Sequence, residues 1–195
     1  MIKRQMLALA IPTVLLSGAV IAQLDRQHDA HSHGTATGNL SLDQGDLRLE
    51  LEIPGINLVG FEHAPNNDEQ TAALDSTERF LRSADWLAAD SRGGCEIASI
   101  SAHSHGFGED DANQADSHEH DHDQGHDHHH DGGTEHAEFH LVVTMECATP
   151  DRLGWIDLRL FENFPGNEEM VINVLTDAVA TQARLTAGNE RIGLD

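Results

Sequence analysis

Alternating apolar and polar residues mark most of the chain after residue 38 as β-structure. Residues 38–53 alternate with period two on either side of a polar turn at 43–46, which predicts a β-hairpin. Residues 138–147 alternate more regularly still, so we expect them to present one buried and one largely polar face of an antiparallel sheet. Further strands are predicted at 95–102, 155–160, 170–176 and 179–186.

One segment has helical spacing instead, with apolar residues at Ala73, Leu74, Phe80, Leu81, Ala84 and Leu87. Asn67 or Asp68 is a good N-cap, and acidic residues follow in the first turn. Gly93 and Gly94 stop the pattern, so the helix is predicted to run to about Ala89. Several strands around one principal helix predict an α+β fold with a mostly antiparallel sheet.

The first 22 residues have the pattern of a secretory signal peptide. Lys3 and Arg4 precede an apolar run, and Ala22 ends a stretch that suits cleavage. An uncleaved membrane anchor is the alternative, but the run is short for a bilayer and Pro12 interrupts it. We therefore expect an exported protein without a membrane anchor after cleavage. It would consist of a mobile segment at 23–37 and a single domain at 38–195.

A histidine-rich segment interrupts that domain at 103–137. Residues 103–140 hold 11 of the 15 histidines, and Asp and Glu fill most of the gaps. Almost nothing apolar lies between Phe107 and Phe139, so burial cannot offset the entropy of ordering the backbone, and we expect a long disordered insertion. Neutral imidazole is a common zinc ligand, and adjacent carboxylates raise its basicity. The candidate ligands are His103, His105, His118, His120, His122, His126, His128, His129, His130, His136 and His140. A solvated acidic linker or a tag is the alternative.

A smaller histidine motif lies near the mature N-terminus. His31 and His33 are two residues apart, and in a strand such residues lie on the same face, where they can chelate one ion together. The same His-x-His-Gly string recurs at 103–106.

Two cysteines flank the insertion. Cys95 and Cys147 predict one disulfide in an oxidising compartment, with a pair of free thiols as the alternative. If the two strands pair antiparallel with these cysteines opposite each other, His103 falls opposite Phe139.

Charge excludes several partners. Eleven Lys and Arg face 34 Asp and Glu, a net charge of −23, which repels nucleic acid and anionic membranes and favours cations. Imidazole suits Zn²⁺, Cu²⁺ and Ni²⁺ alike. The chain has no His-Glu-x-x-His motif and no nucleophile elbow, so we expect a binding protein rather than an enzyme. A metal-dependent hydrolase is the less favoured alternative.

Several of these features together resemble the ZrgA-like proteins, which are periplasmic zinc-uptake accessory proteins of Gram-negative bacteria. The features are the signal peptide, the mature His-x-His-Gly, the string Asn57-Leu-Val-Gly-Phe-Glu-His63, the Cys-flanked His/Asp-rich loop, and Phe161-x-x-Phe164-Pro165. The resemblance implies a periplasmic location, binding of several zinc ions, and assistance to a zinc transporter. The partner implied is a zinc ABC transporter or its substrate-binding protein.

The resemblance carries metal ligation onto His31, His33, Glu62 and His63 as well as the loop histidines. A zinc site needs about four ligands in a tetrahedral array, which the three histidines and one carboxylate supply if the terminus folds back. Each residue also has a structural alternative: His63 satisfies a turn, Glu62 is a surface acid, His140 is solvated on a polar sheet face, and the N-terminal pair belongs to a frayed end. The alternative function is a periplasmic sink against excess zinc, copper or nickel.

Overall fold

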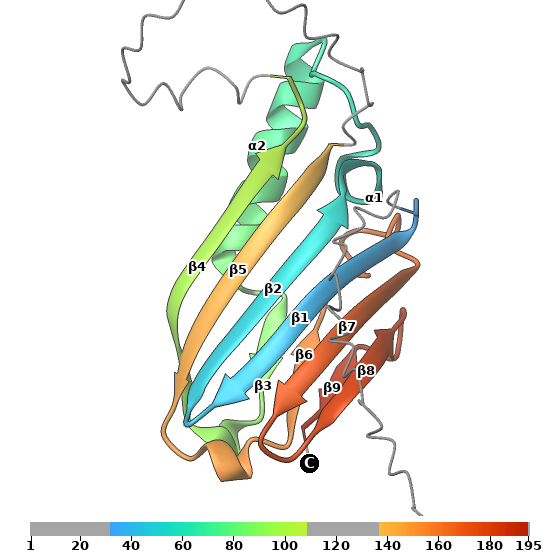
Figure 1. Ribbon diagram of the computed structural model, residues 1–195. Coiled ribbons are helices and arrows are strands. Elements are labelled where there is room, and N and C mark those ends of the chain that lie inside the picture. Colours follow the sequence, from blue (N-terminus) through green and yellow to red (C-terminus); the bar gives the residue numbers. More distant parts are fainter. Residues whose placement is uncertain (1–31, 109–136, 195) are drawn as a thin grey trace, which may run out of the picture.

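A six-stranded sheet dominates the computed structural model, which describes residues 32–108 and 137–194 (Figure 1). Its strands, in spatial order, are β4 (Cys95–His105), β5 (Glu138–Cys147), β2 (Asp46–Pro54), β1 (Thr35–Asp43), β7 (Glu169–Thr176) and β8 (Ala180–Leu185). Neighbouring strands are antiparallel except β1 and β7, which are parallel. The predicted N-terminal hairpin is confirmed as β1 and β2, and the predicted C-terminal hairpin as β7 and β8.

A second layer lies behind this sheet. It consists of helix α2 (Asp68–Ser83) and a three-stranded sheet of β3 (Leu87–Ala89), β6 (Trp155–Leu158) and β9 (Arg191–Gly193). The short helix α1 (Gly55–Val59) follows β2, and two 3-10 turns, η1 (Ser91–Gly93) and η3 (Pro150–Arg152), lie near the opposite end. A largely antiparallel β-architecture with one main helix confirms the predicted α+β class. Within the described residues, no helix has the length and apolar character needed to cross a membrane.

The core lies between the two layers. Leu47, Leu49, Leu51 and Ile53 of β2 are each no more than 2% exposed, and the alternate residues of β5 from Phe139 to Cys147 are buried beside them. Each fully buried Leu or Ile contributes roughly 1.5–3 kcal/mol relative to exposure. The opposite face of the main sheet carries the polar residues of the same strands, as the alternation predicted.

Helix α2 begins where predicted and ends earlier. The side chain of Asn67 accepts a hydrogen bond from the backbone N–H of Gln70 at 2.9 Å, which confirms it as the N-cap. The prediction that the helix reaches about Ala89 is wrong. Ala84 has a left-handed backbone (φ 59°), and the indole N–H of buried Trp86 donates to the carbonyl of Leu81, so the chain reverses and continues as β3.

The small sheet was not predicted, because its strands are short and pair over long distances along the chain. Its last strand is fastened by Arg191, which donates two hydrogen bonds to Asp157 on β6 and lies 3.9 Å from the ring centroid of Trp155. The hydrogen bonds from Arg191 hold the pKa of Asp157 below its usual value, against the opposing effect of burial. The strand predicted over 155–160 ends at Leu158, because its pairing with β3 and β9 extends no further.

The pairing of β4 with β5 contains a register shift. Cys95 lies opposite Cys147, and the predicted disulfide joins them. A bulge between Ile97 and Ser99 then moves the register by one residue. His103 therefore lies opposite His140, and the expected pairing with Phe139 is wrong.

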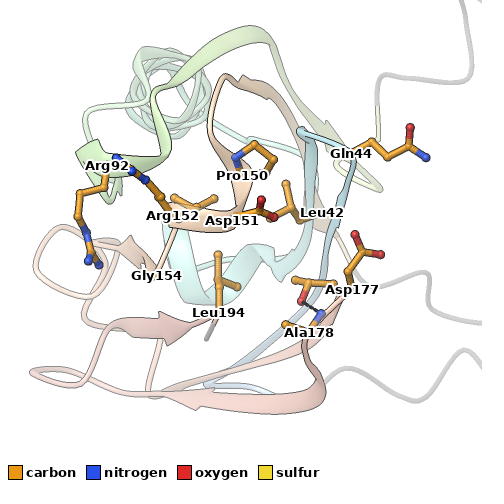
Figure 2. A pocket seen from close by; sticks show the side chains of 12 residues that line it. Leu42, Gln44, Arg92, Pro150, Asp151, Arg152, Gly154, Asp177, Ala178 and Leu194 are labelled. Atoms are coloured by element: carbon orange, nitrogen blue, oxygen red, sulfur yellow. Dashed lines mark hydrogen bonds between the residues drawn. The ribbon is translucent and has the colours of Figure 1, made fainter.

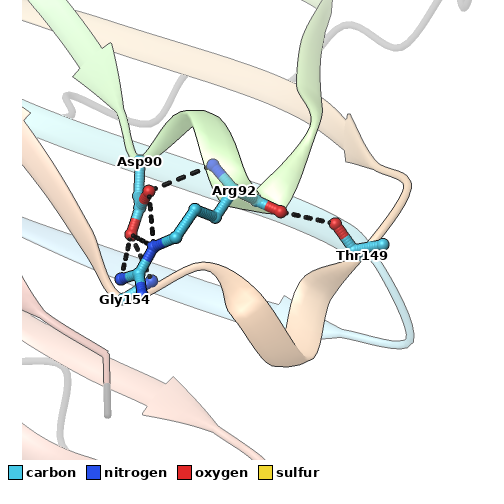
Figure 3. Close-up of polar contacts among 4 residues, drawn as sticks. All are labelled: Asp90, Arg92, Thr149 and Gly154. Carbon is cyan, nitrogen blue, oxygen red and sulfur yellow. Dashed lines mark hydrogen bonds and ion pairs between the residues drawn. The ribbon is translucent and has the colours of Figure 1, made fainter.

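Next to the disulfide, a buried carboxylate clamps the chain around η1 (Figure 3). Asp90, which is 4% exposed, accepts hydrogen bonds from the backbone N–H and the guanidinium of Arg92 and from the N–H of Gly154. Thr149 donates to the carbonyl of Arg92 at 2.6 Å, which links the clamp to the end of β5. The hydrogen bonds from Arg92 lower the pKa of Asp90 to about 2.

We expect this clamp to weaken in acid. Because the folded pKa of Asp90 lies below the unfolded value of about 3.9, its carboxylate stabilises the fold fully above about pH 4, and this contribution disappears as the pH falls to about 2. Denaturant unfolding of the wild type and of Asp90→Asn between pH 5 and 2 checks this. The difference in unfolding free energy between them should shrink as the pH falls, and a constant difference would contradict the assignment.

Candidate metal centre

The predicted metal ligands that the structure describes gather at one end of the main sheet. This is the end where β4 stops, β5 and β1 start, and α1 follows β2 (Figure 1). The described ligands are His33, Glu62, His63, His103, His105 and His140. The others lie outside the described residues: His31, His118, His120, His122, His126, His128, His129, His130 and His136.

The chain around His33 is fixed to the fold by a buried amide. Asn57, on α1, is 4% exposed and accepts a hydrogen bond from the N–H of Gly34 at 2.8 Å. Its own amide N–H donates to buried Asn167 at 3.0 Å. The carbonyl of Gly34 in turn accepts from the N–H groups of Glu168 and Glu169. The Asn57-Leu-Val-Gly-Phe-Glu string therefore holds His33 and Gly34 next to Glu62.

His33 and Glu62 are spaced like two ligands of one zinc ion. Nε2 of His33 lies 3.4 Å from Oε2 of Glu62, with the imidazole exposed and the carboxylate side chain only 15% exposed. Two ligands that bind zinc tetrahedrally at 2.0–2.2 Å are about 3.3–3.5 Å apart. A charge-assisted hydrogen bond would bring the same atoms to about 2.7–2.9 Å. The distance between the two atoms therefore matches the spacing of two ligands of one ion.

His63 is oriented but is not part of this pair. Its ring stacks on Phe61 with centroids 5.2 Å apart, and its Nδ1 lies 2.8 Å from the carbonyl oxygen of Ala64. Since a carbonyl only accepts, Nδ1 is the donor in this contact, and Nε2 is the ring nitrogen left to face a metal ion. Zinc-binding histidines are held in this way, with the second ring nitrogen donating to a carbonyl.

A further carboxylate near His33 was not predicted. A Cβ atom added at Gly34 would lie 3.1 Å from the carboxylate carbon of Glu168, so this exposed acid covers the residue next to His33. Glu168 reaches this place because β7 pairs parallel with β1, with Glu169 beside Thr35. The only indication of this carboxylate in the sequence was that Glu168 and Glu169 precede a predicted strand. No local pattern indicated that β7 pairs parallel with β1.

The ends of the histidine-rich insertion pack on the same segment. The ring of Phe107 contacts Phe61 and Phe139, with centroids 5.7 and 5.6 Å apart. A Cβ atom at Gly108 would lie 2.9 Å from Cβ of Ala64, and the carbonyl of Ala137 accepts from the N–H of Gly55 at 2.7 Å. The chain thus enters the insertion beside Ala64 and leaves it beside Gly55, where an added Cβ atom would lie 3.0 Å from the carbonyl oxygen of Phe61.

Two histidines that the sequence analysis assigned to the insertion belong to the main sheet, and His140 lies in a strand as predicted. His103 and His105 are in β4, and His140 is in β5, all on the polar face. In the described part of the chain, no three His, Cys, Asp or Glu side chains are already gathered around one point. The structure thus pairs His33 with Glu62 and His103 with His140, and does not add His63 to either pair.

A pocket of about 410 Å³ lies at the other end of the main sheet (Figure 2). Turns at Gln44 and Asp177 and the η3 segment surround it, and Arg92 and Arg152 contribute positive charge. Among the described residues, its lining includes two aspartates, Asp151 and Asp177, and no histidine. It is therefore not where a zinc site is expected.

Comparison with known proteins gives one family match. Among curated proteins, none matches the chain. A family model described as ZrgA family zinc uptake protein matches residues 30–194, which include every described ligand. The chain therefore belongs to the ZrgA family of zinc uptake proteins.

Proposed function

We propose that this protein captures Zn²⁺ in the periplasm and passes it to a zinc transporter. In this proposal the histidine-rich insertion collects ions, and a site on the folded domain that includes His33 and Glu62 holds one of them for delivery. The protein acts as a binding protein and performs no chemistry on its cargo. The transporter, or its substrate-binding protein, is the partner.

The observation that carries the proposal is the position of the insertion relative to the pair. Gly108 and Ala137 flank the insertion. Gly108 lies against Ala64, and the carbonyl of Ala137 accepts a hydrogen bond from Gly55, which lies beside the carbonyl of Phe61. An ion bound close to either end of the insertion is therefore near Glu62. Spatial proximity of this kind raises the effective concentration of ions at the folded site.

The two kinds of site are expected to differ in affinity. A ligand on a segment that must be ordered on binding loses free energy to that ordering, whereas a preplaced ligand does not. His33 and Glu62 are already 3.4 Å apart, held through Asn57. The net charge of −23 adds a field that draws cations towards both.

Growth under zinc limitation tests the proposal. Cells lacking the protein should grow slowly when zinc is chelated, and their zinc content should fall. The wild-type gene should restore both, whereas His33→Ala/Glu62→Gln should restore them poorly. Loss of ligands is expected to weaken binding at this site by at least about 10–100-fold, the range seen even for residues that only support a metal ligand.

Glu162→Gln is the matched control. Glu162 also follows a phenylalanine in a Phe-Glu pair but is exposed and lies apart from the histidines in sequence, so its loss should change nothing. Cells that lack the protein and grow normally without zinc, but die in excess zinc, would show a protective sink and overturn the delivery proposal.

A further inference from the structure

We propose that the polar face of the main sheet carries a second zinc site, formed by His103 and His140 on adjacent strands with His105 as a third ligand. These histidines are part of β4 and β5 rather than of the insertion between them. The choice of zinc as the ion rests on the proposed function, whereas the positions of the ligands follow from the strand pairing in the sheet alone.

The bulge in β4 creates the histidine pair. Without it, His103 would pair with Phe139, whose side chain is fully buried, and would face the core. One extra residue between Ile97 and Ser99 changes the register, so that Ala102 faces the core opposite Leu141 and His103 faces outward opposite His140. Bulges often re-aim a side chain in this way next to functional sites.

Contacts on the inner face fix this orientation. Ser104, between His103 and His105, donates hydrogen bonds from its N–H and its hydroxyl to Glu78 of α2, at 3.0 and 2.7 Å. Burial raises the pKa of Glu78, but these hydrogen bonds and Arg82 outweigh it and keep the pKa below its usual value, so the acceptor stays charged. Because strand residues alternate, both histidines must face the open side.

Neighbouring rows on the same face show that opposite side chains touch. Ser99 on β4 lies opposite Thr144 on β5, and the hydroxyl groups of these two residues are 2.7 Å apart. Further across the sheet, Asn173 forms side-chain hydrogen bonds with Asn39 and with Gln182. Directly opposite residues of an antiparallel pair have Cβ atoms about 4.5–5.5 Å apart, which lets His103 and His140 share one ion.

Acidic residues flank the proposed ligands. Glu52 of β2 lies opposite His140, and Glu138 of β5 lies opposite His105. Their negative charge favours a bound cation next to the histidines. No three ligands are gathered in the described structure, so the exposed histidines must rotate to meet the ion. Three protein ligands leave one position open, as in zinc sites that exchange their fourth ligand.

Counting zinc equivalents in the full mature chain tests the site. Zinc is titrated against a chromogenic chelator for the wild type, His103→Ala, His140→Ala and the double variant. If the two residues share one ion, each single variant loses one equivalent and the double variant loses no more. In the wild type, the ring signals of both histidines in NMR spectra should change at the same zinc equivalent.

Ser99→Ala/Thr144→Ala is the matched control, since it removes a polar pair from the same strands and face and should keep every equivalent. Glutamine at 103 and 140 replaces alanine if circular dichroism shows that the alanine variants are not folded. Variants that bind as much zinc as the wild type, or a double variant that loses two equivalents, would overturn the shared site. Neither result depends on growth or on a transporter.

Discussion

Replacing residues 109–136 by a short Gly/Ser linker is expected to remove most of the bound zinc and leave the fold intact. The replaced residues contain eight of the 15 histidines. The strands on either side are already in register, with His105 opposite Glu138, so a short connection closes the hairpin. Phe107 and Ala137 remain in place to complete the core at this end.

Calorimetry on the linker variant measures both parts of this expectation. Its thermal midpoint should match that of the wild type, while the number of zinc ions bound should fall to the few held by the folded domain. Adding His33→Ala/Glu62→Gln to the linker variant should then remove the tightest remaining ion. A linker variant that binds no zinc at all would mean that the insertion is the sole site, and would disprove the folded sites proposed above.

Replacing both Cys95 and Cys147 by serine should lower the unfolding free energy by about 4 kcal/mol. The disulfide closes a loop with a sequence separation of 52, and cross-linking a loop of this size removes that much chain entropy from the unfolded state. Since domains of this size are stable by about 5–15 kcal/mol, the loss is a large fraction of the total.

Urea unfolding of the oxidised wild type, the reduced wild type and the serine variant provides the measurement. The two forms without the disulfide should unfold at similar, lower urea concentrations. The Ser99→Ala/Thr144→Ala variant controls for changes of side chain on the same two strands. Equal midpoints for the oxidised and reduced wild type would contradict a stabilising role for the bond.

Local patterns predicted those parts of the fold that local interactions determine. Strict alternation at 138–147 identified β5 and its buried face, and the side chain of Asn67 identified the start of α2. The end of α2 was mispredicted because Leu87 continues the helical spacing, although the indole of Trp86 turns the chain back. The parallel pairing of β1 with β7 depends on contacts between distant segments, which periodicity does not report.

The residues of the candidate site also fall into two groups, those that the sequence identified and those that depended on pairing between distant strands. The His-x-His spacing pointed to His33 and the family resemblance pointed to Glu62, and the structure places the two side chains 3.4 Å apart. The histidine pair on the sheet depended on a one-residue bulge between Ile97 and Ser99, and no local sequence pattern predicted that bulge. Glu168 depended on the parallel strand pairing. Where long-range geometry decides which residues meet, sequence identifies the ligands and not their partners.

The disulfide also gives the oxidised protein a covalent ring. Residues 95–147 form a closed loop joined through the two sulfur atoms, and the ring contains eleven of the 15 histidines. A single proteolytic cut anywhere within it opens the ring without releasing a fragment, because each new end stays attached through a cysteine. A nicked molecule thus keeps its full set of ring histidines until the bond is reduced.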